Sequence, residues 1–369
     1  MSALPELARY GQSYWLDDLS RRMIENGDLE RRVTEEGLTG VTNNPAIFNA
    51  ALTGSEDYDQ LIRQWAGQHA SHIYETLIVA DVRDACDILR VVYDRTEGRD
   101  GFVSLEVSPQ LARDTQGSIV EARRLWKAVD RPNLFIKIPG TPEGVPAIET
   151  LLIEGININV TLLFSIERYE AVAHAYVRAL ERRKVQHERI DRLASVASFF
   201  LSRIDTLVDE KLQARAKLGD AIAKSLLGQC AVANAKLAYQ RFKETAASTR
   251  WKELERAGAS PQRLLWASTS TKNPAYHDLM YVQPLIGPQT VTTLPSQTIE
   301  AFADHGKAAA TLEQGIKEAW QVTVDLKKTG IDLTHVSNQL LDEGIDKFKK
   351  AYAETLQAIT NKAPLASVR

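Results

Sequence analysis

The feature that most constrains how this chain can fold is a regular alternation of short apolar segments with longer amphipathic ones. Eight segments have the length and the apolar, β-branched content of buried strands, and helix-like stretches separate most of them. Alternating strands and helices form parallel sheets, and eight such strands favour a closed barrel. The predicted strands cover residues 13–19, 37–42, 101–107, 133–139, 156–164, 192–200, 263–269 and 289–295. We therefore predict an α/β fold, an (α/β)8 TIM barrel with additional helices.

The whole chain, residues 1–369, is expected to form one domain. Its 369 residues fit a single barrel that carries insertions, and no linker rich in Gly, Pro or Ser divides it. Two connections look helical and longer than a barrel requires. We interpret residues of about 52–97 and 203–257 as helical insertions, and residues of about 308–361 as C-terminal helices.

Composition excludes several classes of function. Apolar residues make up 44%, charged residues 25% and the net charge is −3, as in a soluble globular protein. Without a long basic run, neither nucleic acid nor an acidic membrane is an expected partner. No apolar run approaches the ~18 residues of a membrane span, and the N-terminus lacks the pattern of a signal peptide, so we expect a cytoplasmic protein.

Cofactor and metal motifs are also missing from the sequence. Cys86 and Cys230 match no metal spacing and are expected to be reduced thiols. The seven histidines fall mostly on predicted helices, and no G-x-S-x-G, Walker or G-x-G-x-x-G sequence is present. We expect neither a metal nor a cofactor.

A lysine in the fourth predicted strand, "NLFIKIP", raises the question of function. Lys137 lies among apolar neighbours, where a charged head group costs several kcal/mol, roughly, unless a partner compensates. Taken alone, Lys137 fits a structural ion pair with Glu106 or Asp17 as well as it fits a chemical role. Likewise, Asn157 needs no function beyond a hydrogen bond to the backbone.

Other predicted strands repeat this pattern of polar residues among apolar ones. Five strands doing so indicate a polar cavity at one end of the barrel, and in this architecture active sites lie at the carboxyl end. The residues concerned are Asp17, Ser104, Glu106, Ser108, Lys137, Asn157, Asn159, Thr161, Ser195 and Ser198. Ser195 and Ser198 differ by three positions and should therefore not share a strand face.

A lysine and two carboxylates suit one type of reaction. Burial favours the neutral form of an amine, which attacks a ketone carbonyl. The resulting Schiff base withdraws electrons and allows the adjacent carbon–carbon bond to break. Two carboxylates in different environments can then divide the proton transfers between them.

The segments together resemble the transaldolase family. The motifs that carry the resemblance are "WLDDLSR" (15–21), "TGVTNNPAIF" (39–48), "VSLEVSP" (103–109), "FIKIPGT" (135–141), "GININVTLLFS" (155–165), "ASFFLSRID" (197–205), "WASTSTKNP" (266–274) and "TVTTLP" (290–295). They cover roughly residues 10–360, in the family's order. The resemblance implies an (α/β)8 barrel and a covalent dihydroxyacetone–lysine intermediate. It also implies transfer of that unit between sugar phosphates of the pentose phosphate pathway, from fructose 6-phosphate or sedoheptulose 7-phosphate to an aldose phosphate.

The resemblance also implies catalytic roles. Lys137 is similar to the Schiff-base lysine, and Asp17 to the acid/base aspartate of carbon–carbon cleavage. Glu106 is similar to the glutamate that shuttles protons with Thr161 and a water. These four residues, Lys137, Asp17, Glu106 and Thr161, are the predicted catalytic residues.

Substrate-binding residues follow from the same motifs. Asn44, Asn159 and Ser198 match residues that hold the dihydroxyacetone hydroxyls, and Arg203 matches a phosphate-binding arginine. Lys272 stands where the family has an arginine, in a segment of altered spacing, so the roles of Ser270 and Thr271 stay open. Asn43 replaces a threonine of many relatives.

Two alternatives remain from the sequence. One is a lyase similar to fructose 6-phosphate aldolase, which typically carries glutamine in place of Glu106 and tyrosine in place of Phe200. The other is a sugar-phosphate-binding barrel without activity, which would require the loss of Lys137 or Asp17. Both residues are present, so we predict a transferase that acts as a monomer or homodimer.

Overall fold

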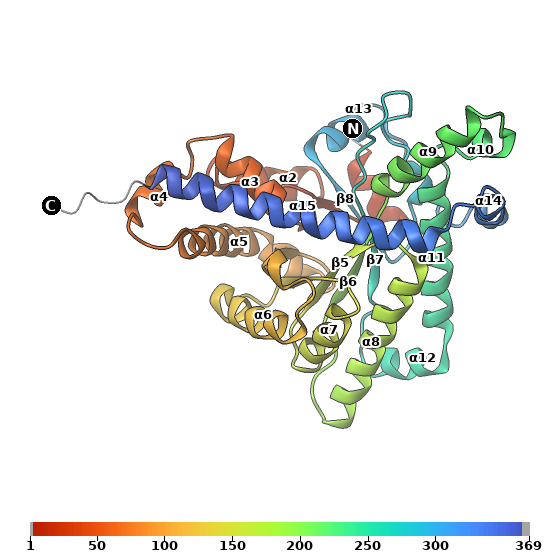
Figure 1. Cartoon of the computed structure of the whole chain (residues 1–369). Helices are drawn as coiled ribbons and strands as arrows, with labels where there is room; N and C mark the ends of the chain where they lie inside the picture. The colour runs from red at the N-terminus through yellow and green to blue at the C-terminus, as the bar shows by residue number, and fades with distance from the viewer. Residues whose placement is uncertain (1–2, 364–369) are drawn as a thin grey trace.

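Eight parallel strands close into a barrel in the computed structural model, which describes residues 3–363 (Figure 1). Each strand pairs with its neighbours in chain order, and β8 returns to β1. The strands are β1 (Gln12–Leu16), β2 (Gly40–Val41), β3 (Phe102–Glu106), β4 (Leu134–Pro139), β5 (Ile158–Leu163), β6 (Ser195–Phe200), β7 (Arg263–Ala267) and β8 (Thr290–Leu294). The predicted TIM barrel is confirmed.

All eight predicted strands are present, and each has fewer residues than its predicted span. The first strand begins one residue earlier than predicted, at Gln12. The largest reduction is in β2, which keeps two residues of the predicted 37–42. Gly40 packs against the indole ring of Trp15, where an added Cβ would lie 2.4 Å from a ring carbon. Only glycine allows this approach of two neighbouring strands.

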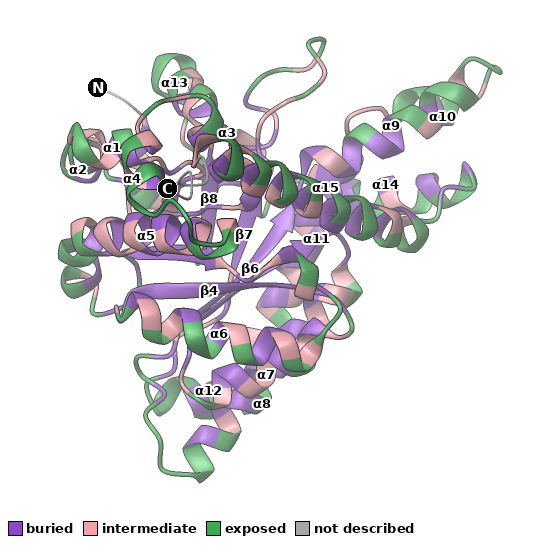
Figure 2. Ribbon diagram, turned by 60° about the vertical axis from the view of Figure 1, so that its left-hand side comes forward, coloured by how far each residue is buried: buried purple, intermediate pink, exposed green. Residues whose placement is uncertain are grey.

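The helices cover the outside of the barrel (Figure 2). Those that precede β5 are α1 (Arg21–Glu25), α2 (Asp28–Glu35), α3 (Pro45–Thr53), α4 (Asp59–Gln64), α5 (Ala70–Arg95), α6 (Thr115–Val129) and α7 (Gly144–Ile153), with 3-10 turns η1 (Leu4–Tyr10) and η2 (Pro109–Leu111). Those that follow β5 are α8 (Ile166–Val185), α9 (Ser202–Ala216), α10 (Ala221–Ser225), α11 (Cys230–Ala247), α12 (Thr249–Arg256), η3 (Gln283–Leu285), α13 (Ser296–His305), α14 (Ile316–Lys328) and α15 (Leu333–Lys362).

One helical expectation requires correction, and one connection between strands has no α-helix. Helical structure was predicted from about residue 308, but α14 begins only at Ile316. The preceding segment instead returns to the barrel, where the backbone N–H groups of Thr311 and Leu312 donate to the carbonyl of Ile286. Between β7 and β8 the described chain has a long loop and η3 in place of an α-helix, since three prolines interrupt residues 268–289.

The predicted insertion 52–97 forms the end of α3, α4 and α5, which pack against the C-terminal helix α15. In Figure 1, α15 runs across one end of the barrel and reaches α4 with its C-terminal end. There, Lys362 Nζ lies 2.6 Å from Asp59 Oδ1 and donates to the carbonyl of Leu52. This anchor fixes the helix over the barrel mouth.

At the amino ends of the strands, the barrel interior is filled by aromatic rings and paired polar groups. Phe102 and Phe135 stack with centroids 4.2 Å apart, and Trp15 lies beside Phe135. The Trp15 indole N–H donates to Asp100, whose carboxylate also contacts Arg263. Packing therefore closes this end and leaves the other end as the place for a site.

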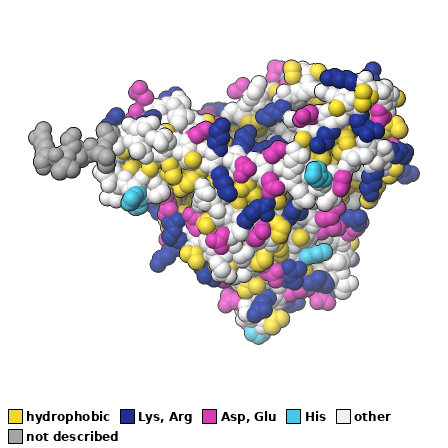
Figure 3. Space-filling model, viewed as in Figure 1, with side chains coloured by type: hydrophobic (Ala, Val, Ile, Leu, Met, Phe, Trp, Pro, Cys, Tyr) yellow, Lys and Arg dark blue, Asp and Glu magenta, His cyan; other side chains and the backbone are white. Residues whose placement is uncertain are grey.

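The remaining general expectations concern membrane spans, surface charge and the two cysteines. No helix among residues 3–363 combines the length and the apolar character that a bilayer span requires. On the face seen in Figure 3, basic and acidic side chains are interspersed. Cys86 and Cys230 are buried, and neither forms a disulfide.

Candidate active site

Polar side chains from most of the strands meet in a cavity of about 340 Å³ at the carboxyl end of the barrel. Its volume is within the range of small-molecule sites. Eight of the ten predicted site residues line it: Asp17, Asn44, Lys137, Thr161, Ser198, Phe200, Arg203 and Lys272. Residues distant in sequence are thus brought together because the strands that carry them are parallel and end at one face.

Lys137 lies at the centre of this arrangement and is 4% exposed. Its Nζ lies 3.1 Å from Glu106 Oε2 and donates to the carbonyl of Asn43 at 3.2 Å. The register of β3 and β4 pairs Glu106 with Lys137 directly, and the next pairing places Lys137 beside Asn159. The ion pair considered from the sequence therefore exists, and it leaves the amine at the surface of the cavity.

Glu106 lies on the other side of this ion pair. It lines a separate cavity of about 320 Å³ whose wall includes Tyr74, Glu121 and Tyr352. Burial raises the pKa of Glu106, while the positive charge of Lys137 opposes this shift. The Lys137–Glu106 pair thus separates two cavities, an arrangement that the sequence did not reveal.

Asp17 follows β1 directly and lines the same cavity as Lys137. The hydroxyl of Thr42 donates to Asp17 Oδ1 at 2.8 Å. Desolvation raises the pKa of Asp17, and Lys137 and the Thr42 hydrogen bond oppose this. The two carboxylates therefore sit in different surroundings, as a division of acid and base roles requires.

Thr161 presents a hydroxyl that has no hydrogen-bond partner among the described residues, although the side chain is fully buried. Glu106 Oε2 likewise lacks a partner with hydrogen-bond geometry in that part of the chain. Leu162, the residue after Thr161, has φ 58°, and the pairing of β5 with β6 shifts register here. Such a bulge redirects a side chain at a functional site.

The predicted hydroxyl-binding residues occupy two levels. Asn44 caps α3, with its Oδ1 accepting from the N–H groups of Ala46 and Ile47, so its amide group is left for the cavity. Asn159 lies below the cavity lining and joins two serines. Its Nδ2 donates to Ser104, and its Oδ1 accepts from Ser198 at 2.7 Å. Ser198 in turn lines the cavity.

Three basic side chains converge at the mouth of the cavity. Arg203 lies 5.3 Å from the ring centroid of Phe200, and burial lowers its pKa. Lys272 Nζ lies 2.6 Å from the hydroxyl of Ser270. Desolvation and then the charges of Arg203 and Lys272 lower the pKa of Lys347 on α15. Among described residues, no carboxylate oxygen lies within 4.0 Å of Arg203 or Lys347.

The contribution of α15 to the cavity was not predicted from the sequence. Lys347 and Phe348 line the cavity, and the ring of Phe348 lies 5.8 Å from the Arg203 guanidinium. At Gly344, an added Cβ would lie 3.0 Å from Leu162 and 3.3 Å from Arg203. The signal available in the sequence was Gly344 followed by Lys347 and Phe348 within an amphipathic helix, which is also an ordinary surface pattern.

Two further residues were missed, and one open assignment is clarified. Thr42 supports Asp17, and Ser268, with φ 56°, lines the cavity and exchanges a hydrogen bond with Ser202. Thr271 does not line the cavity. Its hydroxyl donates to the backbone carbonyls of His277 and Asp278 in the same loop.

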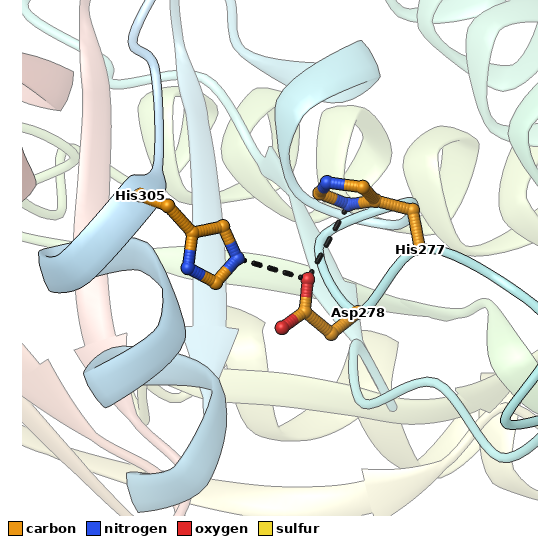
Figure 4. A group of neighbouring side chains, drawn as sticks. All are labelled: His277, Asp278 and His305. Atoms are coloured by element: carbon orange, nitrogen blue, oxygen red, sulfur yellow. Dashed lines mark hydrogen bonds and ion pairs between the residues drawn. The ribbon is translucent and has the colours of Figure 1, made fainter.

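The described residues contain one group whose geometry could hold a metal, and none of its members lines the cavity. It consists of His277, Asp278 and His305, all exposed (Figure 4). This surface cluster is therefore separate from the cavity that Lys137 and Asp17 line.

Comparison with known proteins now decides the family. The model of the family described as transaldolase/fructose-6-phosphate aldolase matches residues 14–359. The chain belongs to the transaldolase/fructose-6-phosphate aldolase family. It is similar to the transaldolase of Trichodesmium erythraeum (50% identity, covering 97% of both chains) and to that of Thiobacillus denitrificans (48%, covering 97% of this chain and all of the relative). It is also 48% identical to transaldolase 2 of Nostoc punctiforme, over 99% of this chain and 98% of that protein.

Membership of the transaldolase/fructose-6-phosphate aldolase family confirms the resemblance found in the sequence. The match extends beyond the barrel strands and includes most of α15, since it ends at residue 359. The C-terminal helix that closes the cavity is therefore part of the family's domain.

Proposed function

We propose that Lys137, Asp17 and Glu106 carry out a transaldolase reaction in this chain. The enzyme is a transferase that moves a dihydroxyacetone unit from fructose 6-phosphate or sedoheptulose 7-phosphate to an aldose phosphate. Full-length similarity to proteins named transaldolase supports this activity. The single observation that carries the mechanism is the position of the buried Lys137 amine. It forms an ion pair with Glu106 and lines the same cavity as Asp17.

The first step is formation of the Schiff base. The neutral Lys137 amine attacks the C2 carbonyl of the donor, and the carbinolamine then loses water to give an imine. Glu106 lies 3.1 Å from Lys137 Nζ and can take up and return the protons of this step. Thr161 supports the same step, because its hydroxyl has no partner among the described residues and can hold a water molecule.

Cleavage is assigned to Asp17. Its carboxylate, which lines the sugar cavity, takes the proton from the C4 hydroxyl of the donor as the C3–C4 bond breaks. The electron pair of that bond passes into the imine and leaves a dihydroxyacetone enamine on Lys137. When the acceptor aldehyde enters, the steps reverse and Asp17 returns the proton.

The two cavities explain why the roles divide in this way. Glu106 is absent from the lining of the sugar cavity and lines the second one, so it is placed to act on water rather than on the C4 hydroxyl. Asp17 lines the sugar cavity and is absent from the lining of the second one. The separation of the carboxylates by Lys137 supports one residue for imine formation and hydrolysis and the other for carbon–carbon chemistry.

Substrate binding follows from the remaining groups. Asn44 and Ser198 are proposed to hold the dihydroxyacetone hydroxyls, with Asn159 fixing Ser198. Arg203, Lys272 and Lys347 are proposed to bind the phosphate, because cations that repel one another at a cavity mouth are stabilised by an anion. Phe200 supports the guanidinium of Arg203 through its ring face.

Product analysis tests transfer against the alternative lyase activity. The enzyme is incubated with fructose 6-phosphate, with and without erythrose 4-phosphate, and the products are separated by mass. A transferase gives sedoheptulose 7-phosphate only when the acceptor is present and releases little free dihydroxyacetone. Rapid release of dihydroxyacetone without an acceptor would identify a lyase. Glu106 and Phe200 stand where the lyases typically carry glutamine and tyrosine, which supports transfer.

A further inference from the structure

A cluster of imidazole and carboxylate groups lies on the surface, outside the machinery described above. His277 and Asp278 belong to the loop between β7 and η3, and His305 is the last residue of α13 (Figure 4). One ligand atom from each residue lies within 4.8 Å of the others. The loop and the helix are separated in sequence by β8, so tertiary structure alone brings these groups together.

Two of the three distances within the cluster are close to those of a tetrahedral zinc site. With Zn–N and Zn–O bonds of about 2.1 Å, neighbouring ligand atoms are about 3.4 Å apart. His277 Nδ1 and Asp278 Oδ1 are 3.4 Å apart, and His305 Nε2 and Asp278 Oδ1 are 3.1 Å apart. Two of the three ligand separations therefore need little adjustment.

A second carboxylate orients the histidine of α13. Asp304 Oδ2 lies 3.1 Å from His305 Nδ1, which leaves Nε2 directed at Asp278. Metal-binding histidines commonly donate their other ring N–H to a carboxylate in this way, which fixes the ring and makes it a better ligand.

His277 is also held in a form that can bind a metal. The backbone N–H of Leu279 donates to His277 Nδ1 at 3.1 Å, which keeps this nitrogen unprotonated. A metal ion would replace that hydrogen bond. In addition, the C-terminal end of α13 favours a nearby cation.

We propose that His277, Asp278 and His305 form a zinc site that joins the β7–β8 loop to α13, with Asp304 as a positioning residue. Imidazole ligands favour Zn²⁺ over Mg²⁺ or Ca²⁺, and three protein ligands leave the fourth position to water. The ion would fix the loop that carries Lys272, because Thr271 is hydrogen-bonded to the carbonyls of His277 and Asp278. It takes no part in the chemistry at Lys137.

Calorimetry with zinc chloride on the full chain, first freed of metal by EDTA and gel filtration, tests the site. We expect one equivalent of Zn²⁺ to bind. H305Q and D278N should each weaken binding by more than tenfold, and D304N by roughly 10–100-fold, the usual effect of losing a partner of a ligand. H335Q, a substitution of an exposed histidine on α15, should leave binding unchanged.

Cobalt(II) provides a second readout that does not depend on affinity. The wild type should give the intense visible bands of tetrahedral cobalt, and H305Q should lose them. The proposal is overturned if the wild type shows no stoichiometric binding. It is also overturned if H305Q and D278N bind Zn²⁺ as the wild type does, or if D304N has no effect while H335Q does.

Discussion

The two ends of one barrel place their polar side chains in different surroundings. At the amino end, the Asp100 carboxylate accepts from the indole of Trp15 and from Ser13, and Arg263 approaches it at 3.6 Å. At the carboxyl end, the Thr161 hydroxyl has no partner among the described residues, and none of their carboxylate oxygens lies within 4.0 Å of Arg203. A satisfied polar network stabilises a fold, whereas unsatisfied groups around a cavity are available to a substrate. Buried polar atoms without a partner in the described part of the chain also occur at the amino end, such as Gln12 Oε1 and Asn133 Oδ1. The difference is therefore the cavity, which makes the unpaired groups at the carboxyl end accessible.

The largest expected effect is at Lys137. Lys137→Ala and Lys137→Arg should abolish the adduct that borohydride traps with fructose 6-phosphate and lower kcat by roughly 10⁶, the scale for loss of a covalent nucleophile. Peptide mapping of the reduced wild-type adduct should locate it on Lys137. Lys350→Ala, at an exposed position of α15, is the control. An adduct on any other lysine would sink the mechanism.

The next largest effects should distinguish the roles of the two carboxylates, Asp17 and Glu106. Asp17→Ala should still form the imine but stall before cleavage, so borohydride should trap a six-carbon adduct. Glu106→Ala should form any adduct slowly, since it acts on the water lost and regained. Each loss should cost roughly 10²–10⁴ in rate. Mass spectrometry distinguishes six-carbon from three-carbon adducts, and Asp18→Asn serves as the neighbouring control. A three-carbon adduct formed by Asp17→Ala at the wild-type rate would contradict the assignment.

A substitution at the amino end of the barrel should lower stability and leave the catalytic rate unchanged. Asp100→Ala removes the shared partner of Trp15, Ser13 and Arg263, and should lower the free energy of unfolding by about 3–5 kcal/mol, the scale for breaking a buried pair. The kcat of the folded fraction should remain that of the wild type. Urea denaturation and active-site titration by borohydride measure the two quantities. A large loss of kcat in fully folded Asp100→Ala would remove the contrast between the ends.

The phosphate site gives intermediate and small effects. Arg203→Ala should weaken phosphorylated donors by roughly 2–5 kcal/mol, and Lys347→Gln by up to about 1 kcal/mol because it is more exposed. Both substitutions should have a smaller effect when unphosphorylated dihydroxyacetone is the donor. Steady-state kinetics with both donors measure this, with Lys350→Gln as the matched control on α15. Equal losses for both donors would mean that Arg203 is structural.

The smallest expected effect is that of chelation. The cavity contains no metal-binding group among described residues, and the reaction proposed for Lys137 uses none. Turnover should therefore survive exhaustive EDTA treatment, even if Zn²⁺ leaves the surface cluster of His277. Loss of turnover that a divalent ion restores would show that the type of chemistry has been misjudged.

The positions of the strands were predictable because strand formation depends on local pattern. The alternation of apolar segments located all eight strands, and Lys137 was recognisable because a lysine inside "LFIKIP" conflicts with its surroundings. Boundaries were less accurate. Helix was expected from about residue 308, but the N–H groups of Thr311 and Leu312 donate to the carbonyl of Ile286 across the molecule, and tertiary contacts of this kind override local preference.

The sequence by itself thus determined the barrel, the lysine within its fourth strand and the residue types around it, since these follow from periodicity and from motifs within single segments. Only the tertiary structure decided that Glu106 lines a different cavity from Asp17 and that α15 brings Lys347 and Phe348 over the mouth. It also placed His305 beside Asp278. These outcomes depend on how a helix crosses the barrel and how a loop returns to it. Such long-range packing leaves no periodic trace in the segments involved, because their surface positions tolerate the same residues with or without a partner.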